Sequence, residues 1–307
     1  MHYQQTLSRS VSLGGVGLHS GHSCKLSLHP APVNTGMIFL RKINNQVHTC
    51  EALIQNLQPM ELCTALESNG FHIQTTEHIL AALWGMEIDN VYIEVDSSEV
   101  PALDGSAAPF VQLIQSAGIV QQKIPRTYLK ILAPLEVGEG TKKVTILPST
   151  TPSITYSIDF DHHMIQQQSF VHDWSVENFK EQIAPARTFA FSHEVEALWS
   201  RGLGKGGSLD NTVVFSDSTI LNEDGLRFID ECVRHKVLDL MGDIALLGVR
   251  LIGHIIADRS GHNLHAQLAR TILQSKEAWT ILPADKHEEE SFATSSSTDS
   301  QNLTSVA

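Results

Sequence analysis

Two kinds of hydrophobic pattern run along the 307-residue chain. Alternating or β-rich runs predict strands, and they occur at Cys24–Leu28, Gly36–Leu40, Val91–Val95, Tyr128–Leu132, Lys143–Leu147, Ile154–Phe160 and Leu251–Ala257. Apolar residues at helical spacing predict helices, and they occur at Thr75–Gly85, Ala107–Ala117, Ser192–Ser200 and, over a longer stretch, from about Gly225 to Leu247. The two kinds of run are interspersed, so the pattern predicts a mixed α and β protein.

A polar segment that contains a proline, Gln121–Arg126, separates two patterned regions. With ~150 residues per domain as a prior, it predicts a first α+β domain over 1–125 and a second over 126–285. From about Lys286 the chain turns to glutamate, serine and threonine. A composition so low in apolar residues predicts a disordered polar tail over 286–307.

The charge balance excludes some partners. The chain has 34 acidic and 21 basic residues and a formal net charge of −13. This argues against a general affinity for nucleic acid or for an anionic membrane surface, because both need clustered Lys and Arg. It does not exclude an anionic small molecule, which senses the local field. The 16 histidines direct attention to metal binding and to acid–base chemistry.

Features that report on the compartment predict a cytoplasmic protein. The four cysteines are widely spaced and form no CxxC pair, which fits a reducing environment. The first twelve residues lack the apolar core of a signal peptide. The most apolar long stretch, Leu240–Ala257, is interrupted by Asp243, Arg250 and His254, so no transmembrane segment is expected.

Three segments carry candidate chemistry, and the first is the Glu77-His78 pair at the start of a predicted helix. A glutamate beside a histidine is the minimum for a general base next to a metal ligand. The alternative is a solvated glutamate in the first helical turn, beside a packed histidine.

The second segment places His235, Asp239 and Asp243 on one face of a single helix. Imidazole and carboxylate at i and i+4 can bind one metal from that face. The alternative is an exposed acidic stripe on an amphipathic helix. Cys232 lies one turn earlier and is expected to be a packed residue.

The third segment is Ser260-Gly-His262, where an apolar strand passes into a helix and functional residues are common. His262 is the expected functional histidine, and His265 is expected to lie at the surface. Together His78, His235 and Asp239 give three ligands and an open fourth position, as in a catalytic zinc site. Glu77 is then the base and His262 an acid or electrophile.

The glycine-rich segment Arg201–Gly207 resembles a phosphate cradle only superficially. It lacks the GK[ST] ending of a P-loop. The expected structure is therefore a plain turn.

A series of motifs in order resembles the UDP-3-O-acyl-N-acetylglucosamine deacetylase family, zinc enzymes of lipid A synthesis in Gram-negative bacteria. The resemblance covers the chain up to about residue 285 and rests on Gly15-Val-Gly-Leu-His-Ser-Gly21, Thr76-Glu-His78, Leu103-Asp-Gly-Ser-Ala-Ala-Pro-Phe110, Ala186-Arg-Thr-Phe189, Arg201-Gly-Leu203, Leu221-Asn-Glu-Asp-Gly-Leu-Arg-Phe228, Arg234-His-Lys-x-x-Asp239 and Ser260-Gly-His262. It implies two similarly folded α+β domains with their helices sandwiched between two β-sheets. It also implies an active site at the domain interface and an acyl-chain passage formed by an insert near 190–222.

The resemblance also implies the reaction and its residues. The N-acetyl group of UDP-3-O-(3-hydroxyacyl)-N-acetylglucosamine is hydrolysed to the free amine and acetate, the committed step of lipid A and lipopolysaccharide synthesis. The implied roles are zinc ligation (Fe²⁺ being an alternative in the cell) by His78, His235 and Asp239; general base for Glu77; acid and oxyanion stabiliser for His262, oriented by Asp243; hydroxyl donor for Thr188; a nearby cation for Lys236; and substrate contact for Phe189, His19 and Arg259. A monomer is expected.

Two departures from the family pattern are visible, Arg259 in place of a lysine and the run Asp161-His162-His163. Two other functions stay open at this point: a zinc amidohydrolase for another N-acyl sugar, and a non-catalytic metal-binding protein with the same fold. The tail over 286–307 is a third candidate, as a docking or degradation signal.

Overall fold

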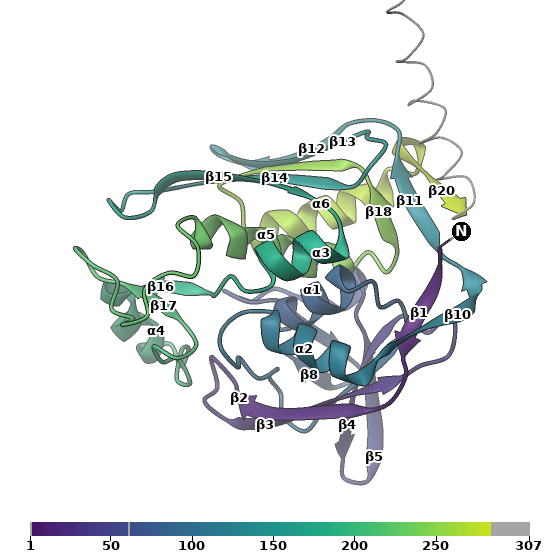
Figure 1. Ribbon diagram of the computed structural model, residues 1–307, viewed down its shortest axis with the longest axis horizontal. Coiled ribbons are helices and arrows are strands. Elements are labelled where there is room, and N and C mark those ends of the chain that lie inside the picture. The colour runs from purple at the N-terminus through teal and green to yellow at the C-terminus, as the bar shows by residue number, and fades with distance from the viewer. Residues whose placement is uncertain (1, 61, 284–307) are drawn as a thin grey trace, which may run out of the picture.

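The computed structural model describes residues 2–60 and 62–283, and it places a layer of helices between two five-stranded β-sheets (Figure 1). The first sheet contains, in order across it, β2 (Val11–Val16), β3 (Ser23–Pro30), β9 (Val91–Val95), β4 (Met37–Ile43) and β5 (Gln46–Glu51). The second contains β12 (Leu135–Glu139), β13 (Lys142–Leu147), β19 (His254–Asp258), β14 (Ser153–Phe160) and β15 (Gln166–Asp173). The main helices between them are α1 (Glu77–Gly85), α2 (Ala108–Ala117), α5 (Glu231–Ala245) and α6 (His262–Gln274).

The two sheets have the same topology. In each, two antiparallel hairpins flank a central strand, which pairs antiparallel with one hairpin and parallel with the other. A helix, α1 or α5, precedes the central strand in the chain, and a second helix, α2 or α6, follows it. The α+β class with helices between two sheets, expected from the resemblance, is therefore confirmed. The domain boundary near residue 125 stays a prediction.

The helices form because the space between the sheets is apolar. All nine residues of α1 are buried, and burying one Leu or Ile side chain stabilises a fold by ~1.5–3 kcal/mol. Helix α2 has Pro109 in its first turn and ends at Gly118, whose φ of 73° suits glycine. Helix α6 has one buried face, which includes Leu264, Leu268 and Ile272.

Helices α1 and α5 approach each other unusually closely. A Cβ on Gly242 of α5 would lie 2.1 Å from the carbonyl oxygen of Glu77, the first residue of α1. No side chain fits at that distance, so glycine is required at this crossing. The contact sets the spacing between the two helices that carry the candidate ligands.

Smaller elements surround the central layers. They are β1 (Tyr3–Leu7), β6 (Leu57–Gln58), β7 (Ala65–Ser68), β8 (Phe71–Ile73), β10 (Ile119–Pro125), β11 (Thr127–Ile131), β16 (Phe189–Phe191), β17 (Val213–Phe215), β18 (Arg250–Ile252), β20 (Trp279–Pro283), α3 (Val176–Asn178) and α4 (Val195–Ser200), with short 3₁₀ or π turns at Ile54–Asn56, Phe179–Ile183, Ser192–Glu194 and Lys276–Ala278.

Two segments near the junction of the halves differ from the prediction. The polar segment Gln121–Arg126 lies mostly in β10, which pairs antiparallel with β1. The run Leu251–Ala257 is not one strand, because β18 pairs with β11 whereas β19 belongs to the second five-stranded sheet. The break falls at Gly253, where a Cβ would lie 3.1 Å from Ile131 and 3.2 Å from Ile146. Tertiary packing thus divides a continuous apolar pattern.

The long helix predicted from Gly225 begins only at Glu231. Gly225 has a φ of 65°, which breaks helical geometry. The Glu231 carboxylate accepts hydrogen bonds from the backbone N–H groups of Arg187 and Arg227, at 2.9 and 2.6 Å, and from the Arg187 guanidinium. These bonds hold the preceding chain in a turn over the helix start.

The segment between β16 and β17 forms a lobe at one side of the layers (Figure 1). The predicted helix over Ser192–Ser200 is a 3₁₀ turn followed by α4. The glycine-rich segment that follows consists of turns, as expected. Its Gly206 N–H donates to Leu18 O at 2.9 Å, so the lobe is attached to the loop after β2.

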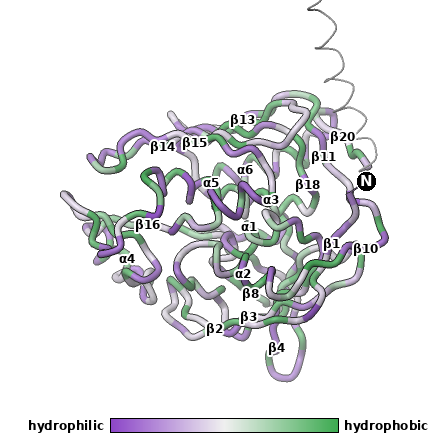
Figure 2. Tube along the Cα trace, in the orientation of Figure 1, coloured by the Kyte–Doolittle hydropathy of each residue, from purple (hydrophilic) through white to green (hydrophobic). Residues whose placement is uncertain are grey.

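Hydropathy follows the layers, because hydrophobic segments lie along the inner helices and strands whereas the tip of the β4–β5 hairpin is hydrophilic (Figure 2). Within residues 2–60 and 62–283, no helix has the length and apolar character needed to cross a membrane. The predicted tail over 286–307 lies outside the described residues.

Candidate metal centre and active site

The start of α1 is held in an unusual backbone conformation. Thr75 has a φ of 59°, a left-handed value that is rare for a β-branched residue. Its hydroxyl donates to Glu99 Oε1 at 2.9 Å, and the buried Glu99 carboxylate also accepts from the backbone N–H groups of His19 and Ser20, both at 2.7 Å. Such strain persists only where surrounding bonds fix it, and it often marks functional sites. Here it directs the Glu77-His78 pair toward α5.

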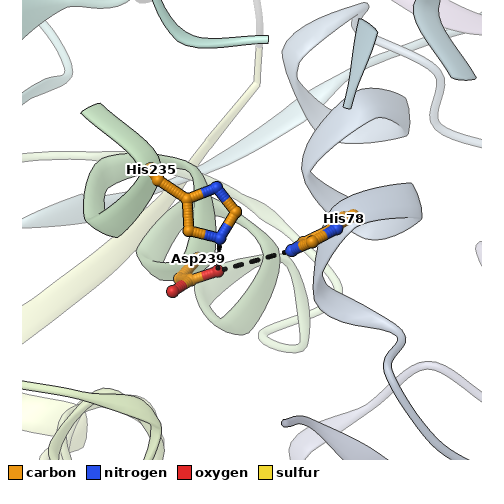
Figure 3. A group of neighbouring side chains, drawn as sticks. All are labelled: His78, His235 and Asp239. Atoms are coloured by element: carbon orange, nitrogen blue, oxygen red, sulfur yellow. Dashed lines mark ion pairs between the residues drawn. The ribbon is translucent and has the colours of Figure 1, made fainter. Parts of the chain in front are cut away.

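His78 of α1 faces His235 and Asp239 of α5 (Figure 3). Asp239 Oδ1 lies 3.8 Å from His78 Nε2 and 3.3 Å from His235 Nε2, and all three side chains are buried. His235 Nδ1 lies 3.0 Å from Ala186 O. Because a carbonyl only accepts, Nδ1 carries the proton and the Nε2 lone pair points toward the cluster. The acidic-stripe alternative is therefore wrong, since Asp239 and Asp243 are buried.

The charge states of these groups fit a metal site. Burial lowers the pKa of His78 to about 3 and also lowers the pKa of His235, so both imidazoles are neutral. Burial alone would raise the pKa of Asp239, but Lys236 and the surrounding histidines lower it. Lys236 Nζ lies 2.6 Å from Asp239 Oδ2, which leaves Oδ1 facing the histidines. Two neutral imidazoles and one carboxylate converging at one point are a donor set that suits a divalent transition metal.

Glu77 lies beside this set and is buried, which contradicts the alternative of a solvated first-turn glutamate. Its Oε2 accepts a hydrogen bond from the Thr64 N–H at 2.9 Å. Burial raises the pKa of Glu77 to about 7, although His262 opposes the rise. A carboxylate with that pKa can gain and lose a proton near neutrality.

His262, in the first turn of α6, pairs with Asp243. Its Nδ1 lies 2.8 Å from Asp243 Oδ2, and the Asp243 Oδ1 accepts from the Thr64 hydroxyl. Burial alone would lower the pKa of His262, but the Asp243 carboxylate raises it to about 9. A pocket of about 150 Å³ opens here, lined by Cys63, Thr64 and His262 among others. His262 is thus a protonated acid beside open space.

The expectation that His265 lies at the surface is wrong. His265 is 0% exposed, and its Nδ1 lies 2.7 Å from Asp243 Oδ2. Its spacing from His262, three positions along a helix, puts both rings on the face that meets α5, and this is the signal that could have revealed it. Thr64, which binds both Glu77 and Asp243, carried no comparable signal because it lies in a loop before β7.

The remaining predicted residues lie at varying distances from this centre. Thr188 is half-buried, and its backbone N–H and C=O bond to Gly105 O and the Val213 N–H. Phe189 contacts the rings of Phe160 and Phe215 edge-on, at centroid distances of 5.6 and 6.3 Å.

His19 and Arg259 form hydrogen bonds with neighbouring segments of the chain rather than with the His78–His235–Asp239 cluster. His19 is buried, and its Nδ1 accepts from the Gly204 N–H at 3.4 Å. Arg259 has a φ of 49° and binds the adjacent Asp258 carboxylate and Thr141 O. Cys232 is packed, as expected.

The run Asp161-His162-His163 forms the turn between β14 and β15. His162 Nε2 donates to Ser216 O at 2.8 Å, which ties this turn to the loop after β17. The turn lines a cavity of about 610 Å³ together with Asp159 and Gln166.

The fold and the site together define an α+β protein of two topologically equivalent sheets, with a buried cluster of two histidines and an aspartate between their helices. Comparison with known proteins supplies the family. A model of the UDP-3-O-acyl N-acetylglycosamine deacetylase family matches residues 4–274, and the chain belongs to this family.

Similar curated proteins carry the name UDP-3-O-acyl-N-acetylglucosamine deacetylase. The protein from Hahella chejuensis is 44% identical over 281 residues, which cover 91% of this chain and 93% of that protein. Those from Syntrophotalea carbinolica and Myxococcus xanthus are 43% and 44% identical, over 92% and 93% of this chain and 91% of each relative.

Proposed function

We propose that the protein hydrolyses the N-acetyl group of UDP-3-O-(3-hydroxyacyl)-N-acetylglucosamine to give the free amine and acetate, the committed step of lipid A biosynthesis. The observation that carries the proposal is the convergence of a buried His78–His235–Asp239 set with a buried glutamate and a protonated histidine, in a chain of this family. The names of the relatives support the substrate.

One Zn²⁺, or Fe²⁺ in the cell, would be held by His78, His235 and Asp239. When bound, such an ion acts as a Lewis acid that lowers the pKa of a water ligand and polarises the acetyl carbonyl. Ala186 O fixes the tautomer of His235, and Lys236 fixes the orientation of Asp239. These contacts support the ligand assignment, because outer partners orient ligands in metal sites.

Glu77 is the general base. It accepts a proton from the attacking water, and the Thr64 N–H keeps its carboxylate in place. The raised pKa of Glu77, about 7, makes the carboxylate basic enough to take that proton at neutral pH.

His262 stabilises the oxyanion and then protonates the leaving amine. Both tasks need a charged imidazolium, and the pKa of about 9 that Asp243 gives it supplies one at neutral pH. The Thr188 hydroxyl is a second donor to the oxyanion, and loss of one such donor typically costs about 10²–10³ in rate. Lys236 adds positive charge near the site.

Phe189, His19 and Arg259 contact the substrate in this proposal, and the insert near 190–222, which includes the lobe, forms the passage for the acyl chain. The domains over 1–125 and 126–285 supply opposite walls of the site. The protein acts as a cytoplasmic monomer.

A deacetylase assay of chelated protein, with and without added Zn²⁺, on UDP-3-O-acyl-GlcNAc of several chain lengths tests the proposal. Turnover should vanish on chelation, return with Zn²⁺ and depend on the 3-O-acyl chain. Equal turnover of N-acetylglucosamine that lacks both UDP and the acyl chain would indicate an amidohydrolase for another sugar. Metal binding without turnover of any of these substrates would indicate a non-catalytic protein.

A further inference from the structure

One carboxylate oxygen in the site serves two histidines. Asp243 Oδ2 lies 2.8 Å from His262 Nδ1 and 2.7 Å from His265 Nδ1, whereas Oδ1 accepts from the Thr64 hydroxyl. An ionised carboxylate has no proton to give, so both imidazoles donate from Nδ1. In the proposed mechanism His262 alone is the acid, and His265 has no role.

The far side of His265 is also engaged. Its Nε2 lies 3.0 Å from Ser260 Oγ and 3.2 Å from the Tyr156 hydroxyl, and Tyr156 donates to Ser260 O at 2.9 Å. Burial lowers the pKa of His265, so its ring is neutral, with a proton on Nδ1 and an acceptor at Nε2. A hydrogen-bonded chain thus runs from His262 through Asp243 and His265 to the β14 strand.

Resting on the proposed function, we propose that His265 is a positioning residue of the reaction, which holds the Asp243 carboxylate for His262 through its Nδ1–H. Asp243 sits on α5 and His262 on α6, so a carboxylate free to rotate would orient the acid poorly. His265 and Thr64 bind it from two sides and leave one direction toward His262. The charged and titratable groups that face His265 are Asp243 and Lys236 from α5, His262 from its own helix and Tyr156 from β14.

The arrangement has a measurable electrostatic consequence. The His265 N–H withdraws negative charge from the oxygen that His262 shares. Removal of this donor makes Asp243 a stronger partner for the imidazolium, and His262 then keeps its proton to higher pH and donates it less readily. A side chain that only filled space would leave the titration of His262 unchanged.

Two substitutions separate the two sides of the ring. His265→Asn places an amide N–H near the position of Nδ1 and keeps the donor to Asp243. His265→Gln places its amide near Nε2 and keeps the contacts with Ser260 and Tyr156, but loses that donor. His172→Gln is a matched control, because His172 is also a buried histidine, and its ring nitrogens have no hydrogen-bond partner among the described residues.

The experiment measures the pH profile of kcat in the Zn²⁺-loaded proteins and the titration of the His262 ring by NMR without substrate. For H265Q we expect kcat to fall about tenfold and the alkaline limb and the His262 titration to move up by about 0.5–1 pH unit. H265N should keep at least half of the wild-type kcat and its pH limb. H172Q should lower Tm without moving either titration.

Three results would overturn the proposal: an unshifted His262 titration in H265Q, an H265N variant as impaired as H265Q, or an equal titration shift in H172Q. The NMR titration needs no turnover. If the wild-type protein fails to deacetylate the UDP-sugar, the proposed function fails, and the coupling of His265 to His262 is still decided.

Discussion

Helices α1 and α5 occupy equivalent places in the two halves, and each carries a histidine seven positions before a glycine. The pairs are His78 with Gly85 and His235 with Gly242. The two imidazoles face each other across the layer, with ring centroids 5.0 Å apart and planes at 89°. The duplicated topology therefore supplies two of the three candidate ligands from matching positions.

The charged residues of the two helices differ, and the difference separates scaffold from chemistry. Glu77 of α1 corresponds to Arg234 of α5, whereas Asp239 and Asp243 of α5 correspond to Ala82 and Met86. One half thus contributes the proposed base, and the other contributes two carboxylates. A symmetric frame brings the histidines together, and the asymmetric residues on it add the candidate base, a candidate ligand and the carboxylate that pairs with His262.

Substitution of His78 or His235 should have the largest effect on metal binding and activity, and the effect should be the same for both residues. We expect His78→Gln and His235→Gln each to lose bound Zn²⁺ and all measurable deacetylation, because two ligands do not hold the ion tightly. Metal content by atomic absorption and turnover test this. Full metal retention in one variant and not in the other would break the equivalence of the two helices.

Glu77 and Arg234 occupy corresponding positions of the two helices, but substitutions of the two residues should differ strongly in their effect on kcat. We expect Glu77→Gln to lower kcat by about 10²–10⁴ with metal retained, because it removes the base. Arg234 instead pairs with Asp230 at 2.6 Å and lies over the rings of Phe170 and Phe228. Arg234→Ala should therefore cost ~1 kcal/mol of stability and leave kcat within about twofold. A large kcat loss in R234A would contradict the contrast.

The two glycines offer a matched test of the helix contact. A Cβ on Gly242 would meet the Glu77 backbone at 2.1 Å, and one on Gly85 would meet the Phe179 ring at 2.3 Å. Each alanine variant should lose ~1–3 kcal/mol of stability by overpacking. Only Gly242→Ala should also weaken Zn²⁺ binding, because it separates α1 from α5. Chemical denaturation and metal titration measure the two effects, and equal metal affinity in both variants would refute the role of this crossing.

The pH profile should show two limbs that belong to different halves. The proposed mechanism needs Glu77 ionised and His262 protonated, so activity should fall tenfold per pH unit below a limb near pH 7 and above a limb near pH 9. A bound cation favours ionised Glu77 and neutral His262, which moves both limbs to lower pH in the holoenzyme. Rate profiles of wild-type and E77Q protein, whose acid limb should disappear, test the assignment.

Much of the site could be predicted because its residues combine local spacing with unusual chemistry. The i, i+4 spacing of His235 and Asp239 and the Glu77-His78 step both mark helix faces, and the structure buries all four residues. Thr64 could not be predicted in this way. Its contact with Asp243 spans 179 positions of sequence, and a threonine in a loop carries no periodic signal.

The fold shows the same division. Periodicity predicts the three inner strands of each five-stranded sheet, but not the edge strands β2, β5, β12 and β15. Gly253 and Glu231 set element boundaries through contacts with Ile131, Ile146, Arg187 and Arg227, which lie far away or outside the periodic pattern. The sequence predicts a surface position for His265 because a histidine on an amphipathic helix is usually solvated, but its hydrogen bond with Asp243 holds the ring in the interior.

The 179-residue separation between Thr64 and Asp243 also orders events during protein synthesis. When α1 leaves the ribosome, α5 has not been made, and His78 has neither His235 nor Asp239 to join. The centre is therefore assembled only when the second half folds against the first, and contacts of such long range make folding slow. A nascent chain that ends before His235 has only one of the three candidate ligands, so metal can bind at this centre only after most of the chain has been translated.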